Sequence, residues 1–411
     1  MTGEDDITRT AHQLRAALGA AADLMVVQDA AALQTEQHVR RATGWLYPLT
    51  AAASVVVIAL AAVFVAHLTG PGRTQGGAQS AAQAPRPEFY MTESYALTGP
   101  NDLHLQVRRT AGGAVTDSMS ISAVNNGWGG YLTAAASDRA FYVAHYPYCT
   151  KAATVTTFSR ITITGSGRIS GVAAVGRPVP GMVTDFAVSP DGSRMAYNAL
   201  PAGCAAVPGS RPAMTGGIQI MDLSTGAVRT WQNTAAAQAQ TTTVGGLSWA
   251  PDGRTLVIDE YSRVLGQADL TVYRLDTASS GGSLQAHSTT LLRQNSNCST
   301  CVKEALAGPD GSLTALESQA AGQQHTRMLV VSIPSAAGSP QTVLYSELSD
   351  STKPVTVNGT GLFADPSGQW VLLWPTGISN PQHQQVAGWI SGGRLHPLPG
   401  VASVFPQGIA W

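Results

Sequence analysis

Alternating apolar and polar residues dominate the chain from residue 89 to its end. Two examples are the runs 184–189, TDFAVS, and 255–261, TLVIDEY. A period of two is typical of a strand that buries one face. Glycine, proline, serine and aspartate cluster between the runs, where they favour turns. The pattern therefore predicts an all-β region of short antiparallel strands.

One turn recurs four times along this region, at intervals of about 60 residues. Proline presets φ at the first central position, Asp or Ser suits the second, and glycine accepts the positive φ that follows. We therefore interpret the aspartates as turn formers and not as catalytic acids. The four copies are Pro190-Asp191-Gly192, Pro251-Asp252-Gly253, Pro309-Asp310-Gly311 and Pro366-Ser367-Gly368.

A second hairpin follows each copy, so that one repeat supplies four strands, the content of one propeller blade. A degenerate copy with Ser137-Asp138-Arg139 at its turn precedes the four. Residues 89–124 supply only three strands, but the C-terminal Gly408-Ile409-Ala410-Trp411 repeats the pattern of Gly246-Leu247-Ser248-Trp249. We predict that the last strand completes the first blade and closes a six-bladed β-propeller over 89–411.

The strand-SPDG-strand sequence, followed by the hairpin GIQIMDLSTG, resembles the WD40-like repeats of TolB-type β-propellers. The resemblance covers about residues 89–411 and implies the propeller fold. It says little about function, because propellers serve as binding proteins, peptidase companions and enzymes. Ser367 in place of Asp, and the turn at 137–139 without Pro and Gly, depart from the pattern.

A second kind of pattern lies before the repeats. The segment Leu46–Leu68, LYPLTAAASVVVIALAAVFVAHL, contains no Asp, Glu, Lys or Arg. A helix of this length spans the roughly 30 Å hydrocarbon core of a bilayer. We predict a transmembrane helix over 45–69; the alternative is a cleaved signal peptide, whose apolar core is usually shorter and nearer the N-terminus. Arg40 and Arg41 precede the segment closely, so the N-terminus is expected in the cytoplasm and the propeller outside it.

Residues 1–44 are predicted to form a cytoplasmic helical tail. Ile7, Leu14, Leu18 and Met25 recur at helical spacing and share one apolar face. This face either lies on the membrane, pairs with a second copy, or binds a cytoplasmic protein. The layout of tail, single membrane helix and outer domain resembles that of membrane-bound anti-sigma factors, which implies transmembrane signalling. The tail has no cysteine, so the zinc-binding His and Cys pattern of many such factors is missing.

Residues 70–88 are rich in Gly, Ala, Gln and Pro and are predicted to be a flexible linker between membrane and propeller. The formal net charge of −1 shows no electrostatic preference for nucleic acid, so no nucleic-acid partner is expected.

All four cysteines lie in the predicted propeller. Cys149 and Cys204 follow the second strands of adjacent blades, so we predict a disulfide between them in an oxidising compartment. Cys298 and Cys301 form a C-x-x-C, which is compatible with redox chemistry or with half a zinc site. Because no second pair of ligands and no thioredoxin-like pattern accompanies it, a structural disulfide is the preferred interpretation.

No catalytic motif is found. The sequence has no Gly-x-Ser-x-Gly elbow, no zinc-binding His-x-x-x-His and no phosphate-binding loop. Asp185, Asp259, Glu260 and Glu317 are candidates to line one end of the propeller channel, where a cation could bind, but the sequence does not place them. No catalytic residue, metal or cofactor is therefore assigned.

The leading prediction is a membrane-anchored, extracytoplasmic propeller that acts as a non-enzymatic binding or scaffold module for a protein or a small molecule. The first alternative is a transmembrane signalling protein with a sensing propeller. The second is a propeller-type metal-dependent hydrolase, such as a lactonase.

Overall fold

A computed structural model of the chain describes most of its second part. The described residues are 84–95, 102–122, 130–134, 137–145, 155–200, 217–232, 241–264, 267–295, 298–321, 326–336, 339–349, 360–375, 387–398 and 408–411. Among them no helix is both long and apolar enough to cross a membrane. The predicted tail and the predicted membrane helix lie outside the described residues, so both stay predictions.

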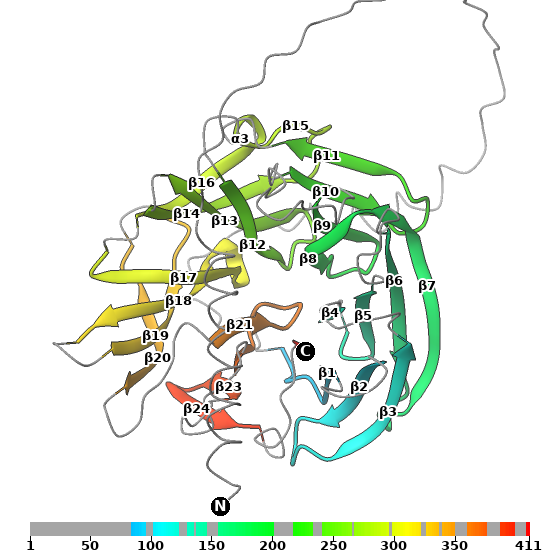
Figure 1. Cartoon of the computed structure of the whole chain (residues 1–411). Coiled ribbons are helices and arrows are strands. Elements are labelled where there is room, and N and C mark those ends of the chain that lie inside the picture. The colour runs from blue at the N-terminus through cyan, green and yellow to red at the C-terminus, as the bar shows by residue number, and fades with distance from the viewer. Residues whose placement is uncertain are drawn as a thin grey trace, which may run out of the picture. The chain divides into compact units, whose positions relative to one another are not determined.

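The described residues form six sheets, antiparallel except for the short β15, arranged as the blades of a propeller (Figure 1). Blade 1 contains β25 (Gly408–Ala410), β1 (Phe89–Tyr95), β2 (Asp102–Arg109) and β3 (Val115–Ser122). Blade 2 contains β4 (Gly130–Ala134), β5 (Ala140–His145), β6 (Val155–Ile163) and β7 (Ile169–Pro180). Blade 3 contains β8 (Met182–Val188), β9 (Arg194–Leu200), β10 (Gly217–Asp222), β11 (Val228–Gln232) and the short β15 (Gly282–Ser283).

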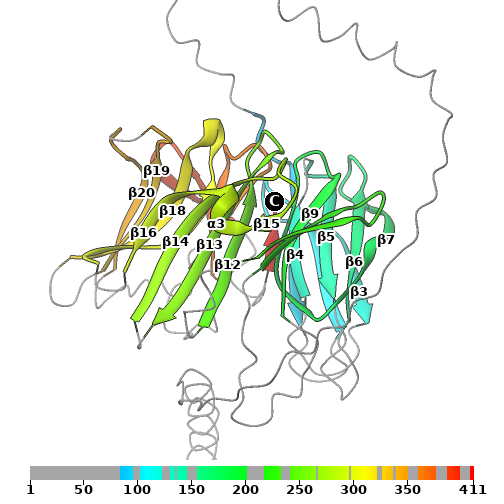
Figure 2. The ribbon, with the colours of Figure 1, turned by 90° about the horizontal axis from the view of Figure 1, so that it is seen from above.

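The remaining three blades follow in chain order. Blade 4 contains β12 (Thr241–Trp249), β13 (Thr255–Val264), β14 (Gln267–Asp276) and β16 (Ser288–Gln294). Blade 5 contains β17 (Thr300–Ala307), β18 (Leu313–Ala320), β19 (Thr326–Ile333) and β20 (Thr342–Ser349). Blade 6 contains β21 (Thr360–Ala364), β22 (Val371–Pro375), β23 (Gly388–Ser391) and β24 (Arg394–Pro397). The first strand of each set lies nearest the centre of the ring, and Figure 2 shows the blades from the side.

The hydrophobic core lies between the blades, because each of six apolar clusters joins two neighbours. For example, Trp231 of blade 3 packs with Trp249 and Leu256 of blade 4. Tyr142 of blade 2 similarly packs with Met195 of blade 3. Alternation along the strands places one face of each sheet against the next blade, which is why the period of two predicted the architecture.

Ring closure by the C-terminal strand is confirmed. Strand β25 pairs with β1 through Met91–Ala410, Thr92–Ile409 and Glu93–Gly408. Trp411, the last residue, is 2% exposed. The predicted six-bladed propeller is therefore closed by a strand taken from the far end of the chain, which removes two free strand edges.

The repeated turns have the predicted geometry in three copies, where Gly192, Gly253 and Gly368 have positive φ. The third copy differs. It forms a 3₁₀ turn, Pro309–Gly311, in which Asp310 itself has φ 58° and Gly311 has φ 74°. Aspartate tolerates this left-handed conformation better than most residues, so the same sequence supports a tighter turn.

A second difference lies in blade 4. The second hairpin of this repeat is expected to end in a strand over 283–292, SLQAHSTTLL, but the start of this run forms a short helix, α3 (Leu284–His287). Ser283 caps this helix by accepting a hydrogen bond from the Ala286 N–H. Just before it, β15 pairs with β11 as an extra strand of blade 3. A serine cap followed by a buried leucine is therefore enough to replace the predicted strand by one helical turn.

Candidate functional site

Three inner strands carry a β-bulge at equivalent positions. The register shifts between Val183 and Asp185 on β8, between Val244 and Gly246 on β12, and between Val302 and Glu304 on β17. Bulges re-aim the side chains beside them. They place one carboxyl group near each of three consecutive blade junctions.

These carboxyl groups connect neighbouring blades. Asp185 accepts a hydrogen bond from the Leu247 N–H of the next blade. Asp259 Oδ2 accepts one from the Ala305 N–H at 2.7 Å. Glu304 Oε2 accepts one from the Leu362 N–H at 2.8 Å. We call these three contacts the inter-blade staples.

The Asp259 staple comes from β13, the second strand of blade 4, because the inner strand β12 has glycine at the equivalent position. Gly246 faces Asp259 across the β12–β13 ladder, and a Cβ on Gly246 would lie 3.3 Å from Asp259 Oδ2. Blade 1 repeats this exchange, since Gly408 faces Glu93 and a Cβ there would lie 2.7 Å from Glu93 Oε1. A small residue on the inner strand thus makes room for an acid on the second strand.

Burial raises the pKa of every acid in this set. The pKa of Asp185 rises to about 7 and that of Glu304 to about 8, in each case mainly because burial disfavours the charged form. The pKa of Asp259 is raised well above its usual value by burial and by the nearby Glu304 and Asp185. Burial alone raises the pKa of Glu93 well above its usual value. These groups therefore hold protons at pH values where exposed acids are ionised.

The structure brings together only part of the set named from the sequence. Asp185 and Asp259 lie close enough to influence each other, and they are joined by Glu304, which sequence reasoning missed. Glu260 faces instead the hydroxyl of Tyr273 at 3.5 Å. In the part of the chain that the structure describes, no group of three or more His, Cys, Asp or Glu side chains could hold a metal ion. Of the acids in this set, Asp185, Asp259 and Glu304 act as staples between neighbouring blades.

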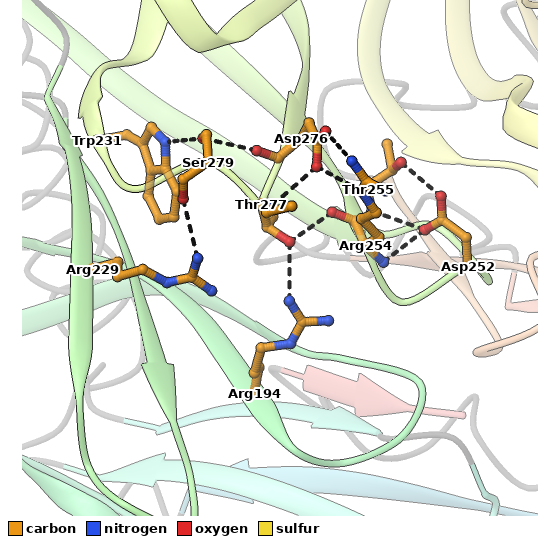
Figure 3. Close-up of polar contacts among 10 residues, drawn as sticks. Arg194, Arg229, Trp231, Asp252, Arg254, Thr255, Asp276, Thr277 and Ser279 are labelled. Carbon is orange, nitrogen blue, oxygen red and sulfur yellow. Dashed lines mark hydrogen bonds and ion pairs between the residues drawn. The ribbon is translucent and has the colours of Figure 1, made fainter. Parts of the chain in front are cut away.

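Blades 3 and 4 are also joined by polar side-chain contacts beside the Pro-Asp-Gly turns (Figure 3). We call the end of the blades that carries these turns the turn face. Arg194 donates to Thr277 Oγ1 at 3.1 Å and to the Gly253 carbonyl, and its guanidinium lies over the Trp249 ring. Trp231 Nε1 donates to Ser279 Oγ at 3.0 Å. This junction is therefore held by polar contacts on the turn face as well as by the Asp185 staple.

The junction between blades 6 and 1 is where the ring closes, and we call it the seam. Its core is an aromatic cluster that includes Tyr90, Trp389 and Trp411. Trp411 meets Trp389 edge-on at 6.5 Å between ring centroids. Trp411 Nε1 is buried without a hydrogen-bond partner. Gly361 of β21 occupies the repeat position that Asp185 and Glu304 occupy in their blades. It has no carboxyl group, and its partner in the neighbouring strand β22 is Trp374. Among the described residues no carboxyl group staples this junction.

Residues 84–88, which we call the strap, cross the seam. The Ala84 N–H donates to Gln369 Oε1 at 2.6 Å, and Trp370 Nε1 donates to the Ala84 carbonyl at 2.9 Å. The Arg86 guanidinium lies 4.6 Å from the centre of the Trp389 ring. These contacts tie the end of the predicted linker to blade 6.

The other end of the strap reaches blades 1 and 2 through Glu88. Its carboxylate pairs with Arg109 at 3.0 Å and with Arg139 at 2.7 Å. Its N–H donates to Asp138 Oδ2 at 2.6 Å. The hydrogen bond from Arg139 is the main cause that lowers the pKa of Glu88. The strap therefore bridges three blades across the closing junction.

A pocket of about 570 Å³ lies beneath the strap. Its walls come from the strap, from the turn between β2 and β3, and from blade 6. The lining residues are Ala84, Pro85, Arg86, Pro87, Glu88, Thr110, Ala111, Trp370, Trp389, Ser391 and His396. The Trp389 ring stacks on His396 at 5.2 Å with an interplanar angle of 11°. We call this cavity the seam pocket. No sequence pattern predicted it, because its lining residues come from three separate segments of the chain.

The predicted turn formers of the first, second and fourth copies take part in local hydrogen-bond networks. Asp191 accepts hydrogen bonds from Ser189 and Ser193, and Asp252 accepts them from Arg254 and Thr255. In the fourth copy, where Ser367 replaces the aspartate, Asp365 accepts from the hydroxyl of Ser367 and from the Trp370 N–H. In this copy the carboxylate that accepts the hydrogen bonds of the turn therefore belongs to the residue before the proline.

Cys298 and Cys301 are joined by a disulfide, with their Cα atoms 5.3 Å apart. The bond joins Cys298, in the connection between β16 of blade 4 and β17 of blade 5, to Cys301 near the start of β17. Cys149 and Cys204 lie outside the described residues, so their pairing stays a prediction. The same holds for the tail face of Ile7, Leu14, Leu18 and Met25.

Comparisons with known proteins show no family for this chain. No protein-family profile matches the chain, and no curated protein matches its sequence. Solved structures similar to it include puromycin hydrolase (15% identity, 75% of this chain and 45% of that chain covered, TM-score 0.44). Another is oligogalacturonate lyase in complex with manganese (14%, 73% and 74%, 0.41). A third is the β-propeller domain of the Trilobed protease from Pyrococcus furiosus, described as having an open velcro topology (12%, 67% and 72%, 0.38).

The prediction that this protein is not an enzyme is contradicted by these comparisons. It rested on the absence of a catalytic motif, yet the propellers found include a hydrolase, a lyase and part of a protease. The fold is therefore no ground for denying the chain an activity. The similarity assigns no reaction to this chain.

Proposed function

We propose that this protein is a membrane-tethered propeller that binds a ligand outside the cytoplasm. The observation that carries the proposal is the strap, because the end of the predicted linker forms one wall of the seam pocket. An occupant of the pocket would touch the residues that lead to the tether. The Cys298–Cys301 disulfide supports the location, since disulfides persist mainly in oxidising compartments.

Lysine labelling in intact cells tests the location. The only lysines of the chain, Lys151, Lys303 and Lys353, follow the predicted membrane helix. A membrane-impermeant amine reagent should label the peptides that contain these lysines to the same extent in intact spheroplasts as after lysis. Labelling only after lysis would place the propeller in the cytoplasm and overturn the proposal.

A tail variant provides the matched control for this experiment. Arg15→Lys adds a lysine on the other side of the predicted membrane helix. The introduced amine should be labelled only after lysis. Equal labelling of the tail peptide that carries this substitution, in intact cells and after lysis, would contradict the predicted orientation.

Signalling is the second candidate, favoured by the apolar stripe of the tail. If the stripe binds a cytoplasmic protein, Leu14→Asp with Leu18→Asp should release that protein while leaving membrane insertion intact. Arg9→Asp with Ala16→Asp, on the opposite face of the predicted helix, is the control. Unchanged co-purification of the partner with the first pair would count against a contact through this face.

A further inference from the structure

We propose that the seam pocket binds a sugar acid, with the ligand carboxylate on Arg86 and a ligand hydroxyl on Thr110. The proposal deepens the proposed function and rests on it only in taking the pocket to be exposed to ligands outside the cytoplasm. The cation, the buried hydroxyl and the walls of the pocket each support it.

Arg86 supplies a cation without a carboxylate partner. Its guanidinium lies over the Trp389 ring, and within the described segments no acid forms an ion pair with it. The one carboxylate that lines the pocket, Glu88, is already paired with Arg109 and Arg139. A guanidinium binds a carboxylate in a bidentate manner and can stay stacked on an aromatic ring while doing so. The Arg86 guanidinium is therefore suited to bind an anionic group of a ligand.

Thr110 supplies the second polar contact. It is 1% exposed and lines the pocket, yet its hydroxyl has no hydrogen-bond partner. The Thr110 N–H is held by the Glu88 carbonyl at 2.9 Å, which fixes the residue beside the strap. A buried hydroxyl without a partner is unfavourable, and a ligand that bonds to it would remove that penalty.

The walls suit a ring with one apolar face and several hydroxyl groups. Pro85, Pro87 and Trp370 supply flat apolar surface, and Ser391 and His396 supply further polar groups. Pockets of roughly 300–1,000 Å³ take small organic ligands, so the volume fits a monosaccharide or a disaccharide. Carboxylate, hydroxyl and flat apolar face occur together in a sugar acid, whereas inorganic phosphate lacks the apolar face and glucose lacks the charge.

Calorimetric titration of the full chain in detergent with D-glucuronate tests the proposal. We expect saturable binding of glucuronate and at least about tenfold weaker binding of D-glucose and of inorganic phosphate, because each lacks one of the contacts. Glucose binding as tightly as glucuronate would rule out the role of Arg86. Phosphate binding as tightly would rule out the ring, and no glucuronate binding would overturn the proposal.

Two variants assign the contacts. Arg86→Gln should weaken glucuronate binding at least about tenfold, whereas Arg327→Gln, at an exposed position of β19 in blade 5, should leave it unchanged. Thr110→Val keeps the shape of the side chain and removes the hydroxyl that has no partner. We expect it to keep or raise the melting temperature while weakening glucuronate binding by a few fold, about threefold or more.

The outcomes separate this proposal from the proposed function. Arg86→Gln or Thr110→Val binding glucuronate as tightly as the original chain would overturn the assigned contacts. A Thr110→Val variant that melts at a lower temperature would show that the hydroxyl is structural and overturn its role in binding. Lysine labelling from outside the cell does not depend on the pocket, so a failed titration with successful labelling would overturn the ligand and leave the location standing.

Discussion

The junction between blades 3 and 4 and the seam between blades 6 and 1 close the same ring by different means. At the first, the Asp185 carboxyl group accepts a backbone N–H of the next blade, and Arg194 bridges to Thr277 on the turn face. At the seam, aromatic rings fill the junction and the strap crosses it from outside. Among the described residues, the seam is also where the inner strands of neighbouring blades make the least contact, between β21 and β25.

The difference follows from the covalent connection. Blades 3 and 4 are joined by the chain, so buried polar groups between them are positioned by local folding. Blades 6 and 1 are completed only when the two ends of the propeller meet, and three residue pairs of β25 and β1 hold them. Burial of aromatic rings supplies stability there. The seam is thus the junction most suited to respond to a ligand.

The largest effect is expected from removing the closing strand. Deletion of residues 406–411 removes β25 and the buried Trp411, and a buried tryptophan alone contributes on the order of 3–5 kcal/mol. We expect aggregation or rapid proteolysis of the propeller. Deletion of residues 70–83 should do neither, because the contacts of the strap begin at Ala84. A 406–411 deletion that melts like the intact chain would contradict closure at the seam.

The staples predict a pH dependence with a definite sign. The pKa values of Asp185, about 7, and Glu304, about 8, lie above those of an unfolded chain. Between about pH 4 and pH 8 the folded protein holds protons that the unfolded chain releases, so stability falls as pH rises through this window. We expect the melting temperature at about pH 8.5 to lie at least about 3 °C below that at about pH 5.5, the equivalent of roughly 1 kcal/mol.

Two substitutions sharpen this pH prediction. Glu304→Gln keeps an oxygen that accepts the Leu362 N–H but cannot ionise, so the difference between the two melting temperatures should shrink. Glu88→Gln is the control, because Glu88 is exposed and the pKa of its carboxyl group is lowered, so that this group stays ionised at both pH values of the comparison. A Glu304→Gln variant with the original pH dependence would show that this staple does not titrate in the window.

A smaller effect on the free energy of unfolding is expected for the two arginines that lie over tryptophan rings, and its size should differ between them. Arg194→Ala loses two hydrogen bonds to blade 4 and the Trp249 contact, so we expect a cost of about 1–2 kcal/mol. Arg86→Ala loses one exposed cation–π contact and should cost about 1 kcal/mol or less. Chemical denaturation measures both. Equal costs would show that the strap holds the seam as firmly as Arg194 holds its junction.

The blades were predictable because their causes are local. Alternation and the Pro-Asp-Gly turn recur in the sequence, and the match of Gly408–Trp411 to Gly246–Trp249 was enough to predict closure. Local causes also explain the two places where the predicted secondary structure was wrong. Ser283 caps α3 where a strand was expected, and Asp310 adopts a positive φ that the proline and glycine around it did not require.

The candidate site was not predictable to the same extent, because its residues meet only through the ring. Glu304 and Glu93 become neighbours of blade junctions through bulges and opposing glycines, which single-strand patterns do not reveal. One signal was present: Gly246 and Gly408 occupy the position of Asp185 and Glu304 in the repeat. The seam pocket combines residues separated by almost the whole propeller, such as Thr110 and Trp389, and no spacing rule connects them.

Hydrogen exchange of the full chain in detergent tests most directly the claim that the seam is the joint of this ring. Local opening exposes amides in proportion to the free energy of that opening. The account predicts faster exchange in β1 and β25 than in β12 and β17, whose junctions carry staples. It also predicts slower exchange in the strap and β1 when D-glucuronate is added. Protection of β1 and β25 equal to or greater than that of β12 and β17 would contradict it.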